Sequence, residues 1–180
     1  MNRPADEELP AGPGDWSANA ASITTDRCRL IPAQASNLPE VVRLRADPGV
    51  RRHLGGPVRE EIVRKQFVEM LARPRAGIYW AVRTLKEDAF VGLVTLDDHH
   101  EGADTEVSFE LMPEFWGLGY AAESVGAALA HARDTLGLPR VVAETQASNT
   151  RSRRLLERLG MRPERRLTRF GAEQVLYATE

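Results

Sequence analysis

The sequence predicts a single domain with a mixed α/β layer fold. Strand-like and helix-like segments follow one another in the order β-α-α-β-β-β-α-β-α-β, and no internal repeat or linker interrupts them. Hydrophobic residues make up 42% of the 180 residues, which is enough to bury a core. Residues 1–22 are rich in Pro, Gly, Ala and acidic residues without periodicity. We therefore expect a flexible tail over residues 1–22 and a folded domain over residues 23–180.

The first half of this domain is predicted to contain a strand, two helices and a β-hairpin. Pro39 opens the first helix, because proline is tolerated in the first helical turn. The second helix carries its apolar residues on one face and is ended by Pro74. A charged turn at residues 85–88 joins the two strands of the hairpin. The predicted ranges are strand 28–33, helices 38–47 and 60–73, and strands 78–84 and 89–96.

The second half begins with a strand in which apolar and polar residues alternate, so that each kind occupies one face. Gly160 ends the last helix as a C-terminal cap. The predicted ranges are strand 105–112, helix 121–133, strand 140–145, helix 149–160 and a final strand 170–179. In the alternating strand, Val107, Phe109 and Leu111 point to one face, and Glu106, Ser108 and Glu110 point to the other.

Composition excludes several classes of function. The net charge of −2 gives no electrostatic argument for a nucleic-acid or membrane partner. The chain contains no apolar run near the ~18 residues that a membrane span needs, and no secretory signal is visible. The single cysteine, Cys28, excludes an internal disulfide and is expected to be packed and unreactive. We therefore expect a cytoplasmic protein.

A glycine-rich stretch, WGLGYAA at residues 116–122, stands at the start of a predicted helix. It matches the dinucleotide fingerprint G-x-G-x-x-A, and Glu144 follows where a ribose-binding acid would lie. The topology opposes that interpretation, because a hairpin-rich sheet comes first and too little chain follows Glu144. The alternative is a pyrophosphate loop, in which backbone N–H groups at a helix N-terminus converge on phosphate oxygens. Gly119 and Ala121 would allow the phosphates to approach.

Two motifs then resemble the GNAT acetyltransferase superfamily. The stretch PEFWGLGYAAES resembles the form PEYWGKGYATEA, which is typical of the RimJ/RimL-like branch that acetylates ribosomal-protein N-termini. The stretch ETQASNTRSRRLLERLGM is similar to the second signature of this branch, in which N-x-x-S precedes a helix ending in Leu-Gly. The segments TDRCRLIPA and RADPGVRRHL resemble its opening strand and helix. Trp116 departs from the superfamily pattern R/Q-x-x-G-x-G/A, because it occupies the first position.

The resemblance implies the GNAT fold, a mixed and mostly antiparallel sheet flanked by helices. It also implies an enzyme that uses acetyl-CoA and transfers the acetyl group directly to a primary amine, either a protein N-terminus or a small molecule. Homodimerisation is plausible by resemblance. The alternative is a CoA-binding module that senses or scaffolds without catalysis. The implied cofactor-binding residues are Leu111 and Met112 through their backbone, Trp116, Gly117, Leu118, Gly119, Tyr120, Ala121, Ala122, Asn149 and Ser152.

The resemblance further implies two catalytic residues. Glu106 would act as the general base, through a water molecule, and Ser152 would lie near the sulfur and could return a proton to it. Tyr120 is the other candidate hydroxyl, although its place in the loop favours packing over the cofactor. Each residue also has a purely structural interpretation. Glu106 could belong to a solvated face paired with arginines, Asn149 could be an N-cap, and Ser152 could be ordinary helix surface.

The stretch DDHHE at residues 97–101 contains residue types that bind metals, but we expect no metal site. Neighbouring residues on a strand point to opposite faces, so they do not give the usual ligand spacing. His99 or His100 could instead border the acceptor site and assist deprotonation. We expect the loops at residues 51–59 and 97–104 to select the acceptor.

Overall fold

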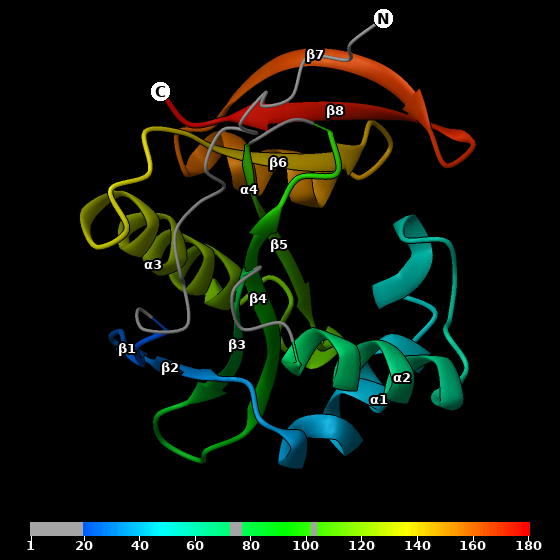
Figure 1. The fold of residues 1–180 in the computed structure, drawn as a ribbon, viewed down its shortest axis with the longest axis vertical. Coiled ribbons are helices and arrows are strands. Elements are labelled where there is room, and N and C mark those ends of the chain that lie inside the picture. The colour runs from blue at the N-terminus through cyan, green and yellow to red at the C-terminus, as the bar shows by residue number, and fades with distance from the viewer. Residues whose placement is uncertain (1–19, 73–76, 102–103) are drawn as a thin grey trace, which may run out of the picture.

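One eight-stranded sheet organises the computed structural model, which describes residues 20–72, 77–101 and 104–180 (Figure 1). The strand order is β1-β2-β3-β4-β5-β6-β8-β7, and every neighbouring pair is antiparallel except β5 and β6. The predicted fold class is confirmed. The strands are β1 (Ile23–Thr24), β2 (Cys28–Pro32), β3 (Gly77–Thr84), β4 (Phe90–Asp98), β5 (Thr105–Leu111), β6 (Val141–Gln146), β7 (Arg162–Arg169) and β8 (Ala172–Ala178).

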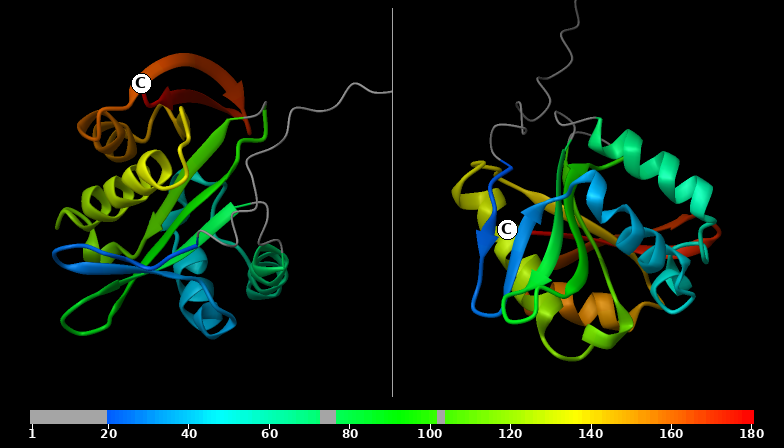
Figure 2. Two further views of the ribbon diagram at one scale, coloured as in Figure 1. Left: turned by 60° about the vertical axis from the view of Figure 1, so that its left-hand side comes forward. Right: turned by 90° about the horizontal axis from the view of Figure 1, so that it is seen from below.

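The α-helices of the described chain cover both faces of the sheet. Helices α3 and α4 lie on one face, and α1 and α2 lie on the other (Figure 2). The helices are α1 (Leu38–Ala46), α2 (Glu60–Leu71), α3 (Tyr120–Asp134) and α4 (Thr150–Arg158), with short 3-10 turns η2 (Ala35–Asn37), η3 (Val50–His53) and η4 (Pro113–Phe115). No helix in the described ranges is both long enough and apolar enough to cross a membrane.

Each helical layer buries its own apolar cluster against the sheet. The cluster under α3 and α4 contains Trp80, Val107 and Tyr177, and the smaller cluster under α1 and α2 contains Phe67 and Leu93. The alternation predicted for β5 is confirmed, because its apolar residues face α3 while its polar residues lie on the face of α1 and α2. The polar side chains of β5 are therefore held on one defined face of the sheet.

The parallel pair β5 and β6 is joined over a short length only. Its register contains two residue pairs, Thr105 with Val141 and Glu106 with Val142. Beyond Glu106 the two strands diverge (Figure 1), so residues 107–111 of β5 have no register partner in β6. The sheet therefore contains a split that starts beside Glu106 and runs along the rest of β5. This split positions the candidate site.

The C-terminal hairpin corrects the prediction of one final strand over residues 170–179. Phe170 and Gly171 form the turn between β7 and β8, with φ angles of 53° and 72°. Positive φ at both central residues is typical of two-residue hairpin turns. Strand β7 was not predicted, because it lies at the sheet edge with mostly exposed, charged side chains and shows no apolar alternation.

The predicted tail lies outside the described residues except for its last three. Within those three, the carbonyl of Ala21 accepts a hydrogen bond of 3.0 Å from the indole of buried Trp80. Ala20 packs against the larger apolar cluster. The chain is therefore already anchored to the domain ahead of the predicted boundary at residue 23.

Candidate cofactor and acceptor site

The loop before α3 forms a helix N-terminus lined by small residues. Gly119 is the N-cap with a φ of +88°, a conformation that favours glycine. The N–H of Glu123 donates to the carbonyl of Gly119 at 3.1 Å, which is the first turn of the helix. The preceding N–H groups, from Tyr120 to Ala122, have no acceptor within the helix. Together with the helix dipole, these N–H groups suit an anion such as a pyrophosphate.

Arg27 stabilises this loop through hydrogen bonds, and the sequence analysis did not identify this residue. Its Nη1 donates to the carbonyl of Leu118 at 2.9 Å, and its Nε donates to a carboxylate oxygen of Glu123 at 2.7 Å. Its guanidinium also lies over the ring of Tyr120, at 4.7 Å from the centroid. Burial raises the pKa of Glu123, but hydrogen bonds from Thr25 and Arg27 outweigh this effect and lower it overall. The negative charge of Glu123, in the first turn of α3, is therefore compensated by Arg27.

Trp116 connects the end of β5 to its surroundings. The indole Nε1 donates to the carbonyl of Leu111 at 2.8 Å. A Cβ placed on Gly49 would lie 3.2 Å from the edge of the same ring, so the loop after α1 runs close to the indole. Met112 is also engaged, because its N–H donates to the carbonyl of Val91 at 2.9 Å. The carbonyl of Leu111 and the amide of Met112 thus have partners within the chain, whereas Phe109 lies on the edge of the split.

Asn149 and Ser152 meet at the start of α4. The side-chain oxygen of Asn149 accepts a hydrogen bond of 3.2 Å from the backbone N–H of Ser152, so Asn149 is the N-cap of the helix. The structural interpretation of Asn149 is therefore correct. A side-chain amide has donors as well as an oxygen, so capping leaves the predicted cofactor contact open.

Glu106 lies at the closed end of the split. One of its carboxylate oxygens accepts a hydrogen bond of 3.2 Å from the backbone N–H of Glu144 in β6, and its register partner in β4 is Asp97. Burial raises the pKa of Glu106, and this effect outweighs the lowering by the hydrogen bond from the Glu144 N–H and by nearby His99. A carboxylate with a raised pKa is a better proton acceptor near neutral pH.

Glu110 differs from Glu106, although the two share a face. Arg45 and Arg51 lie 3.2 Å and 3.3 Å from the carboxylate oxygens of Glu110. The pairing of acids with arginines that the sequence left open is therefore realised at Glu110. Among the described residues, no cation pairs with Glu106. This face is consequently less acidic than predicted, and the β5 carboxylate without a cation partner among the described residues, Glu106, lies at the end of the split.

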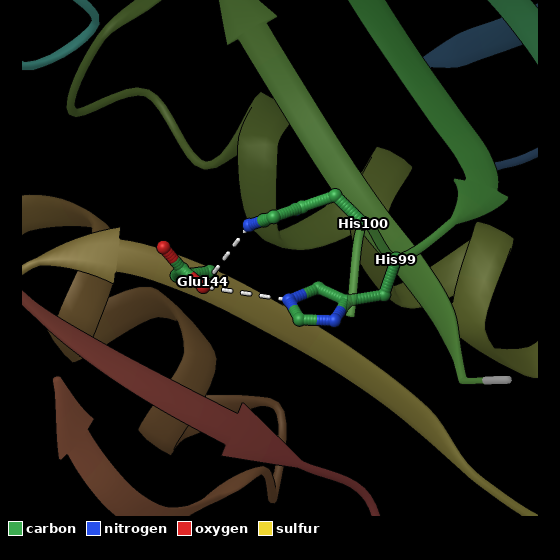
Figure 3. Close-up of side chains that lie close together, drawn as sticks. All are labelled: His99, His100 and Glu144. Carbon is green, nitrogen blue, oxygen red and sulfur yellow. Dashed lines mark hydrogen bonds and ion pairs between the residues drawn. The ribbon is translucent and has the colours of Figure 1, made fainter. Parts of the chain in front are cut away.

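His99 and His100 converge on one oxygen of Glu144 (Figure 3). Their Nε2 atoms lie 3.4 Å and 3.8 Å from Glu144 Oε2. The expectation that these neighbours point to opposite faces is wrong, because β4 ends at Asp98 and both histidines follow it. The donor types suit a metal ion, but Arg169 already donates to the same oxygen at 2.8 Å. The arginine supplies the positive charge that a cation would otherwise bring.

His53 is a second residue that sequence reasoning missed. Its Nδ1 lies 3.2 Å from the side-chain oxygen of Gln146 and 3.3 Å from the hydroxyl of Ser148. The contact joins turn η3 to the end of β6. Gln146 follows His53 by 93 positions in the chain, so no local sequence pattern could have indicated the pairing. The contact places the loop after α1 at the open end of the split.

Comparison with known proteins identifies the family. The model of the acetyltransferase (GNAT) domain matches residues 27–162, a range that contains the loop, the split and all of α4. The chain belongs to the GNAT acetyltransferase family. The N-acetyltransferase YoaA of Bacillus subtilis (strain 168) is 27% identical to this acetyltransferase over 149 residues, covering 79% of this chain and 83% of YoaA.

Solved structures support the fold of the acetyltransferase. A GNAT-family acetyltransferase from Bacillus anthracis superposes with a TM-score of 0.76 at 23% identity, covering 88% of this chain and 97% of the other. RimL, a ribosomal L7/L12 alpha-N-protein acetyltransferase solved in complex with coenzyme A, superposes with a TM-score of 0.74 at 18% identity, covering 88% and 97%. The acetyltransferase is thus an N-acetyltransferase of a family that uses acetyl-CoA, and the family implies an amine acceptor.

Proposed function

We propose that the acetyltransferase binds acetyl-CoA along the split between β5 and β6, with the pyrophosphate on the loop at residues 116–122. The observation that carries this proposal is the two-pair register of β5 and β6, which leaves an open strand edge leading to the N-terminus of α3. An extended amide chain such as pantetheine can pair with an open strand edge. Because the carbonyl of Leu111 is engaged by Trp116, we place the main pairing at Phe109, with Leu111 and Met112 at its end.

The acceptor amine then approaches from the face of α1 and α2, where Glu106 lies. Bound acetyl-CoA supplies the acetyl group as an activated thioester. Glu106 takes a proton from the amine through a water molecule, so that the nitrogen can form its bond to the acetyl carbon as the carbon–sulfur bond breaks. Ser152, half-buried in the first turn of α4, is the proposed donor of the proton that the sulfur receives.

The proposed acceptor is a primary amine, on a protein N-terminus or on a small molecule. Turn η3 with His53 and the loop with His99 and His100 border this face and would contact the acceptor. Burial and the neighbouring His99 lower the pKa of His100, which favours its neutral form near pH 7. A neutral imidazole does not repel a cationic amine, which the negative charge of Glu106 would attract.

A thiol-release assay with a panel of primary amines tests the function. The panel contains peptides with free N-termini, polyamines, amino-acid derivatives and aminoglycosides, and the free thiol of coenzyme A is measured. Turnover with a primary amine, and none with its N-acetylated form, is expected. Tight binding of acetyl-CoA without turnover across the panel would favour a CoA-binding module. No binding of acetyl-CoA at all would refute the proposal.

Two substitutions at Asn149 separate its role as a helix N-cap from its proposed contact with the cofactor. Asn149→Ser keeps an N-cap and removes the amide, whereas Asn149→Ala removes both. We expect Asn149→Ala to lose about 1 kcal/mol of unfolding free energy in urea melts, and Asn149→Ser to retain nearly all of it. Both variants should raise the KM for acetyl-CoA about fivefold, since a neutral hydrogen bond contributes about 1 kcal/mol. An unchanged KM in Asn149→Ser would leave only the capping role.

A further inference from the structure

Arg151 is an exposed arginine in the first turn of α4 that reaches across to the loop before α3. Its guanidinium carbon lies 5.0 Å from the centroid of the Trp116 ring. Within the described ranges, Arg151 makes no ion pair and no hydrogen bond. Stacking on the indole is thus the contact that fixes its direction, and its donor groups are unused.

The indole beneath Arg151 is itself held in place. Its Nε1 is bonded to the carbonyl of Leu111, and its edge lies against the loop at Gly49. Trp116 directly precedes Gly117, the first glycine of the loop. The guanidinium therefore lies over the residue that begins the loop at residues 116–122.

Two other arginines, Arg27 and Arg153, are already engaged. Arg27 directs its donors to Glu123 and to the carbonyl of Leu118. Arg153, two residues further along α4, donates to the hydroxyl of Tyr177 and the carbonyl of Ala147. Because Arg27 is paired with Glu123, it brings no net charge to the loop, whereas Arg151 brings an unpaired positive charge to the ring of Trp116.

We propose that Arg151 binds a phosphate of coenzyme A while its guanidinium stays over the ring of Trp116. A guanidinium combines a planar face, which stacks on aromatic rings, with forked donors that fit phosphate oxygens. Trp116 occupies the loop position at which the sequence pattern has Arg or Gln, and the positive charge comes from α4 instead. The inference rests on the proposed cofactor site and assigns one part of that site to one residue.

Three acetyl donors test the assignment by kcat/KM: acetyl-CoA, acetyl-3′-dephospho-CoA and S-acetylpantetheine, which carries no phosphate. We expect Arg151→Gln to lower kcat/KM for acetyl-CoA about tenfold, through KM, and to leave S-acetylpantetheine unaffected. A loss that persists with the dephospho donor assigns Arg151 to the pyrophosphate. A loss that disappears with it assigns Arg151 to the 3′-phosphate.

Two further variants separate recognition from general effects. Arg158→Gln removes the same charge from the far end of α4 and should leave all three donors unchanged. Arg151→Lys keeps the charge without the planar, forked guanidinium and should recover part of the loss. Equal losses with all three donors, or no loss with any, would overturn the assignment. Failure of the wild type to bind acetyl-CoA would instead refute the proposed function on which it rests.

Discussion

Gly119→Glu is expected to weaken acetyl-CoA binding at least ~100-fold in titration calorimetry, about 2.7 kcal/mol. The φ of +88° is unfavourable for any L side chain, and the new Cβ would lie 3.0 Å from a terminal nitrogen of Arg27. The added carboxylate would stand among the N–H groups of the α3 N-terminus, where it competes with and repels a pyrophosphate. The electrostatic potential at the N-terminus of α3 would therefore repel an anion instead of attracting it.

Gly137→Glu is the matched control for this substitution. Gly137 also has a positive φ, +64°, and a Cβ there would meet nothing within 4 Å. It lies after α3, remote from the loop. We expect it to lose about 1–2 kcal/mol of stability from backbone strain while binding acetyl-CoA like the wild type. Equal binding by both variants would contradict the assignment of the loop to the pyrophosphate.

Glu106→Gln is expected to lower kcat by a factor of about 10²–10⁴, the usual contribution of a general base, with little change in the KM for acetyl-CoA. Since the base must be ionised, kcat/KM of the wild type should rise with pH through the raised pKa of Glu106. The variant should lack this rise. A pH–rate profile over both enzymes measures the difference, and an unchanged rise in the variant would assign the base elsewhere.

The same substitution should make the protein more stable at neutral pH. Burial raises the pKa of Glu106 in the folded state, so the stability due to its neutral form is complete at low pH and is lost as pH rises through that pKa. Glutamine carries no charge and can still accept the hydrogen bond from Glu144. Urea melts should show the gain at pH 7 and its disappearance near pH 4.

Glu110→Gln, on the same face of β5, provides a contrast. It leaves Arg45 and Arg51 without their carboxylate, so we expect a loss of stability at pH 7 instead of a gain. A gain in Glu110→Gln as large as that in Glu106→Gln would mean that removing any acid from this face is stabilising. The sign of the change therefore distinguishes a buried uncompensated carboxylate from a paired one.

Local sequence signals predicted most of the fold, because most elements carry a periodicity that burial imposes. The helix α2 shows this at Val63 and Phe67, which are both buried. The ends of α4 were predictable from a different signal, the cap residue Asn149 and the closing Gly160. Strand β7 lacks such a signal, since an exposed edge strand imposes no apolar pattern. Its turn at residues 170–171 ends in glycine, which was the one available sign of a hairpin.

The candidate site was only partly predictable, because much of it depends on contacts between distant segments. The loop at residues 116–122 was predictable from its small residues before a helix. Arg27, His53 and Arg151 act through contacts with segments far away in the chain, for which sequence offers no spacing rule. The hydrogen bond from Trp116 to the carbonyl of Leu111 joins residues that are close in sequence. It depends, however, on the direction of the indole side chain, which composition does not reveal.

The split between β5 and β6 has a consequence for how the molecule opens. The backbone ladder is nearly interrupted there, yet Val107, Leu156 and Tyr177 from both sides belong to one apolar cluster. Side-chain packing therefore joins the two portions of the sheet where hydrogen bonds do not. In native-state hydrogen exchange, we expect the amides of β8 to open together as a unit of lower stability than those of β3 and β4. A ligand that contacts both sides of the split would make the amides of the two units open together.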